Sequence, residues 1–343
     1  MERIKIRMSD KVTVLVPIYN VEKYVAKCLE SLLSQTYQNF EVWAVIDGSP
    51  DNSKEIVEEY AKRDSRIKLI DKENGGYGSV LEYGVQNIKS KYFLVCDPDD
   101  WLRKDALEKL VTLAEKNNLD LVVGDKFNVY DENEEEQNYV TSKPEELKII
   151  PRKVYSNIND IQKFAFFSVS PHAKLFRTEI AKNIKFPRKV SYTDFVLYIE
   201  SLINTKRIAY LDEGLAYYLT ERPGNTKTDV RPSIIDDYLI GWNTVFDKLD
   251  SINDGQDVNQ LLFRLYWQLR FILSEYYRTS KNPFKDSYIN KIDIAIKKLQ
   301  SRKNYVIKGG YKTGMLSLKG KLTVRGMMNP ITYKPIRKMI SKK

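Results

Sequence analysis

Histidine and cysteine are nearly absent from this chain of 343 residues, which holds one histidine and two cysteines. The single histidine, His172, excludes a histidine-rich metal site and leaves a Ser-His-Asp hydrolase only one base to use. Cys28 and Cys96 each lie in an apolar pattern and lack the spacing of a metal site. So few cysteines are typical of a reduced, cytoplasmic compartment.

Long apolar runs are also missing. No run reaches the roughly 18 residues that a membrane-spanning helix needs. The start, MERIKIRMSD, lacks the apolar core of a signal peptide. We therefore expect a chain that neither spans a membrane nor is secreted.

Positive charge is concentrated at one end of the chain. The formal charge is +10, yet residues 281–343 alone carry 17 Lys or Arg against two Asp, an excess of +15, so residues 1–280 carry −5. Such a basic tail can rest on the anionic inner face of a membrane, pack against a second copy in a homo-oligomer, or be a solvated face. It shows no nucleic-acid-binding motif, so we expect no nucleic-acid partner.

Short apolar runs alternate with helical patterns over the first 125 residues. The runs at 12–17, 40–46, 67–70, 92–96 and 121–124 predict strands. Repeated alternation of strand and helix predicts an α/β fold with a mostly parallel sheet flanked by helices. Beyond Pro232 the apolar spacing becomes helical, which predicts a helical and basic C-terminal region over residues 231–343.

Polar loops follow three of the predicted strands, at 17–20, 47–51 and 97–100, and the last two carry aspartates. Ligands of parallel α/β sheets bind outside the carboxyl ends of the strands. We therefore expect these three loops to meet at one edge of the sheet and to form a site.

Three carboxylates crowd the last loop, which reads DPDD. Ionised Asp97, Asp99 and Asp100 repel one another, and a hard divalent cation with oxygen ligands relieves that repulsion. Mn²⁺ or Mg²⁺ held there would neutralise charge on a departing diphosphate. Asp100 is also expected to cap a helix that begins near Leu102.

Two other loops suit a nucleotide. The Asp47 carboxylate can accept the imide N–H of uracil, and Tyr19 offers an aromatic face to a base. A turn before a helix is the alternative for Asp47. The glycine-rich turn Asn74-Gly75-Gly76 lets backbone amides approach a phosphate or a sugar, although a plain turn explains it nearly as well.

Taken together, four segments resemble the ordered motifs of family 2 glycosyltransferases. They are VLVPIYN (14–20), IDGSPDNS (46–53), ENGG (73–76) and YFLVCDPDDW (92–101). The resemblance is close over residues 10–125 and weak over about 170–220. It implies a GT-A domain over residues 1–230, with a nucleotide-sugar half (1–125) and an acceptor half (126–230).

The resemblance also implies an activity. The donor would be a UDP-sugar, and the acceptor would be a hydroxyl of a glycan, a lipid-linked or a protein-linked molecule. Transfer would invert the anomeric centre and serve the synthesis of cell-surface polysaccharide or glycoconjugate. The metal would be Mn²⁺ or Mg²⁺.

Roles for single residues follow from the same resemblance. Asp99 is the metal ligand, Asp97 faces the ribose or the metal, and Asp194 in SYTDF is the base that takes the acceptor proton. The nucleotide-sugar site comprises Pro17, Tyr19, Asp47, Asn74, Gly75, Gly76 and Asp97. On the acceptor side stand His172, Tyr217 and Arg222, for which packing or a bystander position is the alternative.

Three positions depart from the family pattern. Ile46 replaces the first aspartate of an Asp-Asp-Gly-Ser loop, Leu81 stands where an arginine often meets the diphosphate, and Thr193 replaces a glutamate. These departures leave open a nucleotide-sugar-binding or membrane-surface module without turnover. A nucleotidyltransferase is a further alternative, although the loop after the first strand has neither a glycine nor a basic residue.

Overall fold

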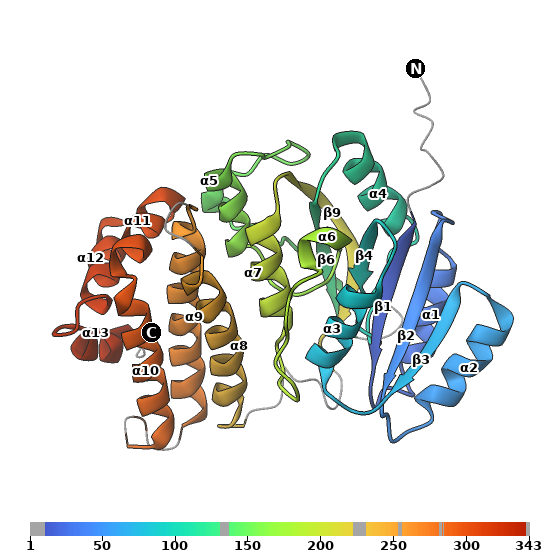
Figure 1. Ribbon diagram of the computed structural model, residues 1–343, viewed down its shortest axis with the longest axis horizontal. Helices are drawn as coiled ribbons and strands as arrows, with labels where there is room; N and C mark the ends of the chain where they lie inside the picture. Colours follow the sequence, from blue (N-terminus) through green and yellow to red (C-terminus); the bar gives the residue numbers. More distant parts are fainter. Residues whose placement is uncertain are drawn as a thin grey trace.

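A mixed sheet with nine strands runs through the part of the chain that the computed structural model describes, residues 11–130, 137–221, 231–252, 256–280, 283 and 285–340 (Figure 1). The strands are β1 (Val12–Ile18), β2 (Phe40–Asp47), β3 (Ile67–Lys72), β4 (Tyr92–Val95), β5 (Trp101–Leu102), β6 (Leu121–Val129), β7 (Gln137–Val140), β8 (Lys174–Arg177) and β9 (Ile208–Leu219). Their order is β3-β2-β1-β4-β8-β6-β9-β5, and β7 pairs with β6.

Parallel pairing joins the strands that the sequence predicted. Strands β3, β2, β1 and β4 are parallel neighbours, and β6 is parallel to β9. Strand β8 is antiparallel to both β4 and β6 and links the two parallel parts. The predicted α/β class with a mostly parallel sheet is therefore confirmed.

Helices cover both faces of the sheet. They are α1 (Val25–Leu33), α2 (Ser53–Arg63), α3 (Tyr77–Asn87), α4 (Ala106–Asn117), α5 (Ile158–Ile161), α6 (Thr178–Ala181) and α7 (Asp194–Asn204). Side chains of β1 alternate between two buried clusters, because successive residues of a strand point to opposite faces. Val14 and Val16 pack with α1, α2 and α4, whereas Leu15 packs with α3.

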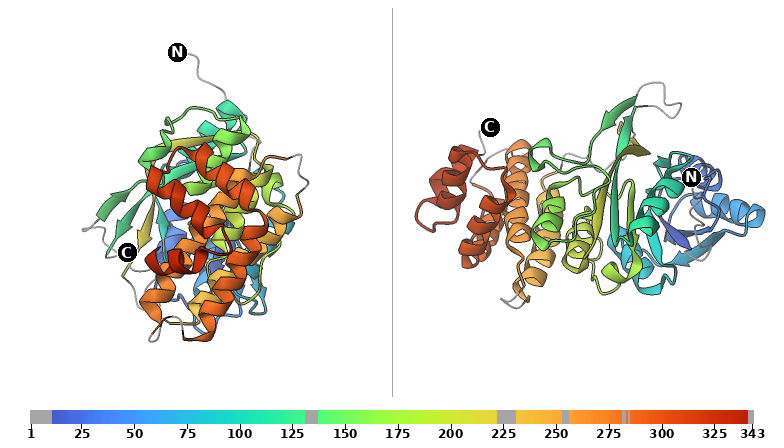
Figure 2. Two further views of the ribbon diagram at one scale, coloured as in Figure 1. Left: turned by 90° about the vertical axis from the view of Figure 1, so that its left-hand side faces the viewer. Right: turned by 90° about the horizontal axis from the view of Figure 1, so that it is seen from above.

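A bundle of helices completes the chain and confirms the predicted helical C-terminal region (Figures 1 and 2). Its members are α8 (Ile234–Asp250), α9 (Asn259–Thr279), α10 (Ser287–Ser301), α11 (Lys303–Thr313), α12 (Leu318–Met327) and α13 (Tyr333–Ile340). Aromatic rings join the bundle to the rest, since Phe166 lies 5.7 Å from Phe263 and 5.5 Å from Trp267 between ring centroids. The predicted domain boundary at residue 230 lies outside the described residues and stays a prediction.

One predicted cap is wrong. Helix α4 begins at Ala106 with Asp105 at its N-cap position, four residues later than expected. The intervening Trp101 and Leu102 form β5, which pairs with β9, so Asp100 does not cap the helix. Its carboxylate is buried and accepts a hydrogen bond from the backbone N–H of Leu219, at 2.8 Å.

Among the described residues, none of the helices combines the length and the apolar character needed to cross a membrane.

Candidate active site

The three loops meet at the carboxyl edge of β1, β2 and β4, where they line a cleft of about 1220 Å³. The strand register brings these ends level, since Ile18 pairs with Ile46 and Leu15 with Val95. Most of the predicted site residues line this cleft: Pro17, Tyr19, Asp47, Asn74, Gly76, Asp97, Asp99, His172 and Asp194.

At one end of the cleft, Tyr19 presents an open aromatic ring, with 50% of its surface exposed. Hydrogen bonds tie the loop after β1 to the loop after β2. The Asn20 N–H donates to Ser49 Oγ at 2.8 Å, and the Glu22 N–H donates to Asp51 Oδ2 at 2.8 Å. Because both loops are held together, the ring of Tyr19 is positioned by the sheet edge.

Asp47 holds the glycine-rich turn in place. Its Oδ1 accepts from Lys72 Nζ and from the Gly75 N–H at 3.0 Å, and its Oδ2 accepts from the Gly76 N–H at 2.8 Å. Gly75 thus contributes through its backbone. A carboxylate oxygen has two lone pairs, so Oδ2 keeps room for a further donor such as the imide of a base.

Gly76 joins this turn to the segment that carries Asp194. Its φ is +81°, and a Cβ there would lie 2.8 Å from the Cα of Lys189, so only glycine fits. The Lys189 N–H donates to the Gly75 carbonyl at 2.9 Å. Segment 187–194 therefore rests directly on the turn.

Asp194 is the first residue of α7 and is half-buried at the cleft. Burial raises its pKa to about 6, against the hydrogen bond that its Oδ1 accepts from the Phe195 N–H and the nearby charge of Lys174. A carboxylate with this pKa is ionised near neutral pH and remains basic enough to take a proton.

The acids of DPDD face different ways. Asp97 is half-buried, and its Oδ1 accepts a hydrogen bond from the Tyr77 hydroxyl at 2.8 Å. Burial, followed by the charge of Asp99, raises the pKa of Asp97 to about 7. Burial and the charges of Asp99 and Asp97 raise the pKa of Asp100 well above its usual range. At both groups burial is the larger cause, and the neighbouring carboxylates add to it.

His172 is buried beside these acids. Its Nε2 lies 2.5 Å from Asp100 Oδ2, and its ring lies 4.9 Å from the ring of Tyr218. Burial lowers its pKa well below the usual value, with smaller contributions from Lys126 and Lys174, so the imidazole is neutral. Its buried Nδ1 has no hydrogen-bond partner among the described residues.

Asp97, Asp100 and His172 together could hold a metal ion, since one ligand atom from each lies within 4.8 Å of the others. Two carboxylates and a neutral imidazole suit Mn²⁺ better than Mg²⁺, which prefers oxygen alone. The assignment of Asp99 as the metal ligand stays a prediction.

Several cleft residues were not singled out as site residues from the sequence. Lys126 on β6 lies 3.4 Å from Ser170 Oγ and 4.2 Å from the centre of the Tyr218 ring. Its charge lowers the pKa values of Asp97, Asp100 and Asp194, although burial outweighs it at each. Lys126 lies just beyond the predicted strand 121–124 and next to Asp125, and no pattern there marked it as a site residue.

Of the predicted acceptor-side residues Tyr217 and Arg222, the structure describes only Tyr217. The ring of Tyr217 packs between Trp101 and Phe127, at 5.7 and 5.4 Å between centroids, and its neighbour Tyr218 lines the cleft. Arg222 lies outside the described residues. The acceptor role of both stays a prediction.

The three departures from the family pattern are all buried. Ile46 is 1% exposed, and Leu81 and Thr193 are fully buried. None of the three is among the residues that line the cleft.

Comparison with known proteins gives the family. The model of glycosyl transferase family 2 matches residues 13–185. The glycosyltransferase GlyA of Streptococcus pneumoniae serotype 4 is 32% identical over 216 residues, which cover 62% of this chain and 31% of GlyA. The glycosyltransferase GlyG of the same organism is 30% identical over 267 residues, which cover 75% of this chain and 86% of GlyG. This chain thus spans under a third of GlyA and most of GlyG.

Solved structures show the fold. Residues 1–349 of S. aureus TarS in complex with UDP-GlcNAc superpose with a TM-score of 0.64 at 20% identity, covering 92% of this chain and 90% of that chain. The likeness extends through the helical bundle and confirms the expected GT-A fold. With the family model matching half of the sequence, the chain belongs to glycosyl transferase family 2.

Proposed function

We propose that this chain transfers a sugar from a UDP-sugar to a hydroxyl of a glycan, lipid-linked or protein-linked acceptor, for cell-surface polysaccharide or glycoconjugate synthesis. One observation carries the proposal: a single cleft has Tyr19 and Asp47 at its nucleotide end and Asp97, Asp99 and Asp194 beside them. The relative named poly(ribitol-phosphate) beta-N-acetylglucosaminyltransferase TarS has been solved with UDP-GlcNAc. UDP-N-acetylhexosamines are therefore the first donors to test.

In this proposal Tyr19 stacks on the uracil ring and Asp47 Oδ2 accepts its imide N–H. Asn74, Gly75 and Gly76 form the wall along the donor. Because Asp47 also holds that turn, nucleotide binding and the shape of the wall depend on the same carboxylate.

Asp97 is the acid that faces the metal or the ribose, with Asp100 and His172 as its candidate co-ligands. Asp99 is the metal ligand that the family resemblance implies. A bound Mn²⁺ or Mg²⁺ supplies positive charge for the departing diphosphate. Lys126, which lines the same cleft, adds positive charge. Buried Leu81 cannot, although it stands where the family often has an arginine.

Asp194 removes the proton from the acceptor hydroxyl as its oxygen attacks the anomeric carbon. The bond from that carbon to the diphosphate breaks on the opposite face, UDP leaves with the electron pair, and the configuration inverts. The N-terminus of α7 favours the ionised form of Asp194, which counteracts part of the effect of burial.

Nucleotide titration tests the binding half of the proposal. UDP, CDP, ADP and GDP are titrated calorimetrically into the full chain, with Mn²⁺ and then with EDTA. We expect UDP to bind more tightly than the other three, and EDTA to weaken binding by about tenfold or more, since metal–phosphate contacts are worth several kcal/mol.

The variant Asp97→Asn should lose the difference between Mn²⁺ and EDTA. Equal affinity for all four nucleotides, or a preference for a purine nucleotide, would contradict the assignment of Tyr19 and Asp47 to uracil.

A further inference from the structure

Helices α11, α12 and α13 form the end of the molecule farthest from α2 (Figures 1 and 2). One side of this end packs inward, since Val324 and Met327 of α12 are 1% exposed. The other side carries apolar side chains that face solvent.

These outward side chains are unusually exposed for their size. Leu318 and Leu322, one turn apart on α12, are 77% and 61% exposed. Ile331 in the following turn is 86% exposed, and Met339 on α13 is 67% exposed. Single exposed apolar residues are ordinary, but four within 22 positions make exposed apolar side chains unusually dense at this end of the molecule.

Positive charge surrounds them. Residues 294–343 hold 14 Lys or Arg and neither Asp nor Glu. Lys319, Lys321 and Arg325 are exposed on α12, and Lys334 is exposed on α13. The exposed face thus mixes aliphatic side chains and cations, which is the composition of a surface that lies at a membrane interface.

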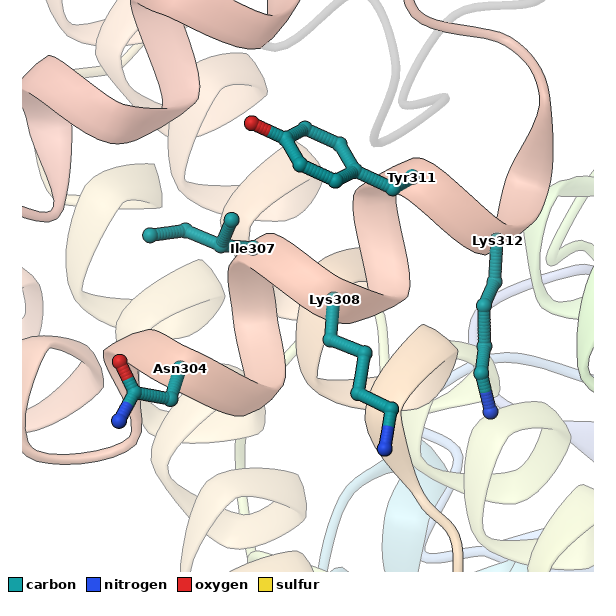
Figure 3. Close-up of a pocket in the computed structure, with 5 residues that line it drawn as sticks. All are labelled: Asn304, Ile307, Lys308, Tyr311 and Lys312. Atoms are coloured by element: carbon teal, nitrogen blue, oxygen red, sulfur yellow. The ribbon is translucent and has the colours of Figure 1, made fainter.

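The charged surface continues onto α11. Lys321 and Arg325 lie over the Tyr311 ring, at 5.4 and 5.5 Å from its centre. Tyr311 also lines a shallow groove of about 470 Å³, together with Asn304, Ile307, Lys308 and Lys312 (Figure 3). Lys308 is exposed there, and Lys312 is held by Asp257 and Asn159.

We propose that the exposed face of α11–α13 binds the surface of a membrane that contains anionic lipids. Leu318, Leu322 and Ile331 enter the headgroup region, and the lysines contact lipid phosphates. A second copy of this chain fits the face poorly, because self-association would bring like charges together. Nucleic acid would match the charge but would leave the aliphatic side chains without a partner.

Vesicle flotation of the full chain tests this proposal. Phosphatidylcholine vesicles with phosphatidylglycerol should carry the protein at low salt and release it as salt rises, because screening shortens the reach of the charges. Vesicles of phosphatidylcholine alone should carry little. The triple variant Leu318→Ser, Leu322→Ser, Ile331→Ser should bind the anionic vesicles with an affinity lower by a factor of about ten or more.

Matched controls are exposed residues outside α11–α13. The control variants are Ile150→Ser and Lys104→Glu. Ile150 is 55% exposed, Lys104 is exposed, and neither residue belongs to α11–α13. The control variants should float with anionic vesicles to the same extent as the unchanged chain. The double variant Lys319→Glu, Lys321→Glu should float less. Unchanged UDP affinity in every variant separates this test from that of sugar transfer.

Equal binding to neutral and anionic vesicles, or full binding by the triple variant, would overturn the proposal. So would flotation that fails at low salt while light scattering shows a dimer that the triple variant abolishes, since the face would then join two copies.

Discussion

At the scale of single residues, Asp194 carries the clearest prediction. The variant Asp194→Asn keeps the size of the side chain and removes the base, so UDP release from a donor sugar should fall by about 10² to 10⁴. The affinity for UDP, measured by calorimetry, should change little because the proposed mechanism places Asp194 on the acceptor side.

The pH profile gives an independent readout of the same residue. The pKa of Asp194 is raised to about 6, and the base acts when ionised, so kcat/KM should rise as pH passes upward through about 6 and then level off. This step should disappear in Asp194→Asn. A profile that keeps the step, or turnover that persists in the variant, would assign the base elsewhere.

The sequence located most of the candidate site at this scale, and the reason is the sheet. Asp47 and Asp97 follow strands, and parallel strands bring their carboxyl ends to one edge. The different contacts of the three aspartates in DPDD could not be predicted, because those of Asp100 depend on β9 and His172, which lie far along the chain. The sequence predicted that the Asp100 carboxylate caps a helix. In the structure this carboxylate instead forms hydrogen bonds with the backbone N–H of Leu219 and with the ring of His172.

At the scale of structural elements, the contact between the glycine-rich turn and segment 187–194 is the point to test. In Gly76→Ala the added Cβ would lie 2.8 Å from Lys189 Cα, in addition to the left-handed backbone. We expect the free energy of unfolding to fall by about 1 to 3 kcal/mol and UDP affinity to fall with it.

Gly314 provides the control. It has a similar φ of +74°, but a Cβ there would meet no atom within 4 Å. Gly314→Ala should therefore lower the free energy of unfolding by about 1 to 2 kcal/mol, as backbone strain alone does, and leave UDP affinity unchanged. Chemical denaturation and calorimetry measure the two effects. If both variants bind UDP equally well, the contact of Gly76 with Lys189 does not shape the site.

Element types were easier to predict than their ends. The strands at 12–17 and 40–46 were found within one residue of β1 and β2, since buried strands form short apolar runs. The separate helices within the last 40 residues could not be delimited from the sequence, because the glycines there are poor helix formers. In the structure Gly309 lies inside α11, where a Cβ would be 2.0 Å from the Asn259 carbonyl oxygen, so close packing on α9 requires it.

At the scale of the whole molecule, the sheet and the bundle share a core. One buried cluster contains Leu15 of the sheet, Val196 of α7 and Leu262 of α9. Composition and charge predicted a body and a basic helical region, but how the two pack depends on contacts that no local pattern reports. In the proposed mechanism this contact matters, because α7 carries Asp194 and packs between the sheet and the bundle (Figure 1).

The central claim is that this whole assembly turns over a UDP-sugar, and UDP release tests it most directly. The full chain is incubated with a panel of UDP-sugars that includes UDP-GlcNAc, with Mn²⁺ or with EDTA, and free UDP is measured over time. We expect release from one donor above all others, faster with Mn²⁺ than with EDTA. Binding of UDP without release from any UDP-sugar in the panel, with or without metal, would contradict the account and identify a nucleotide-sugar-binding module.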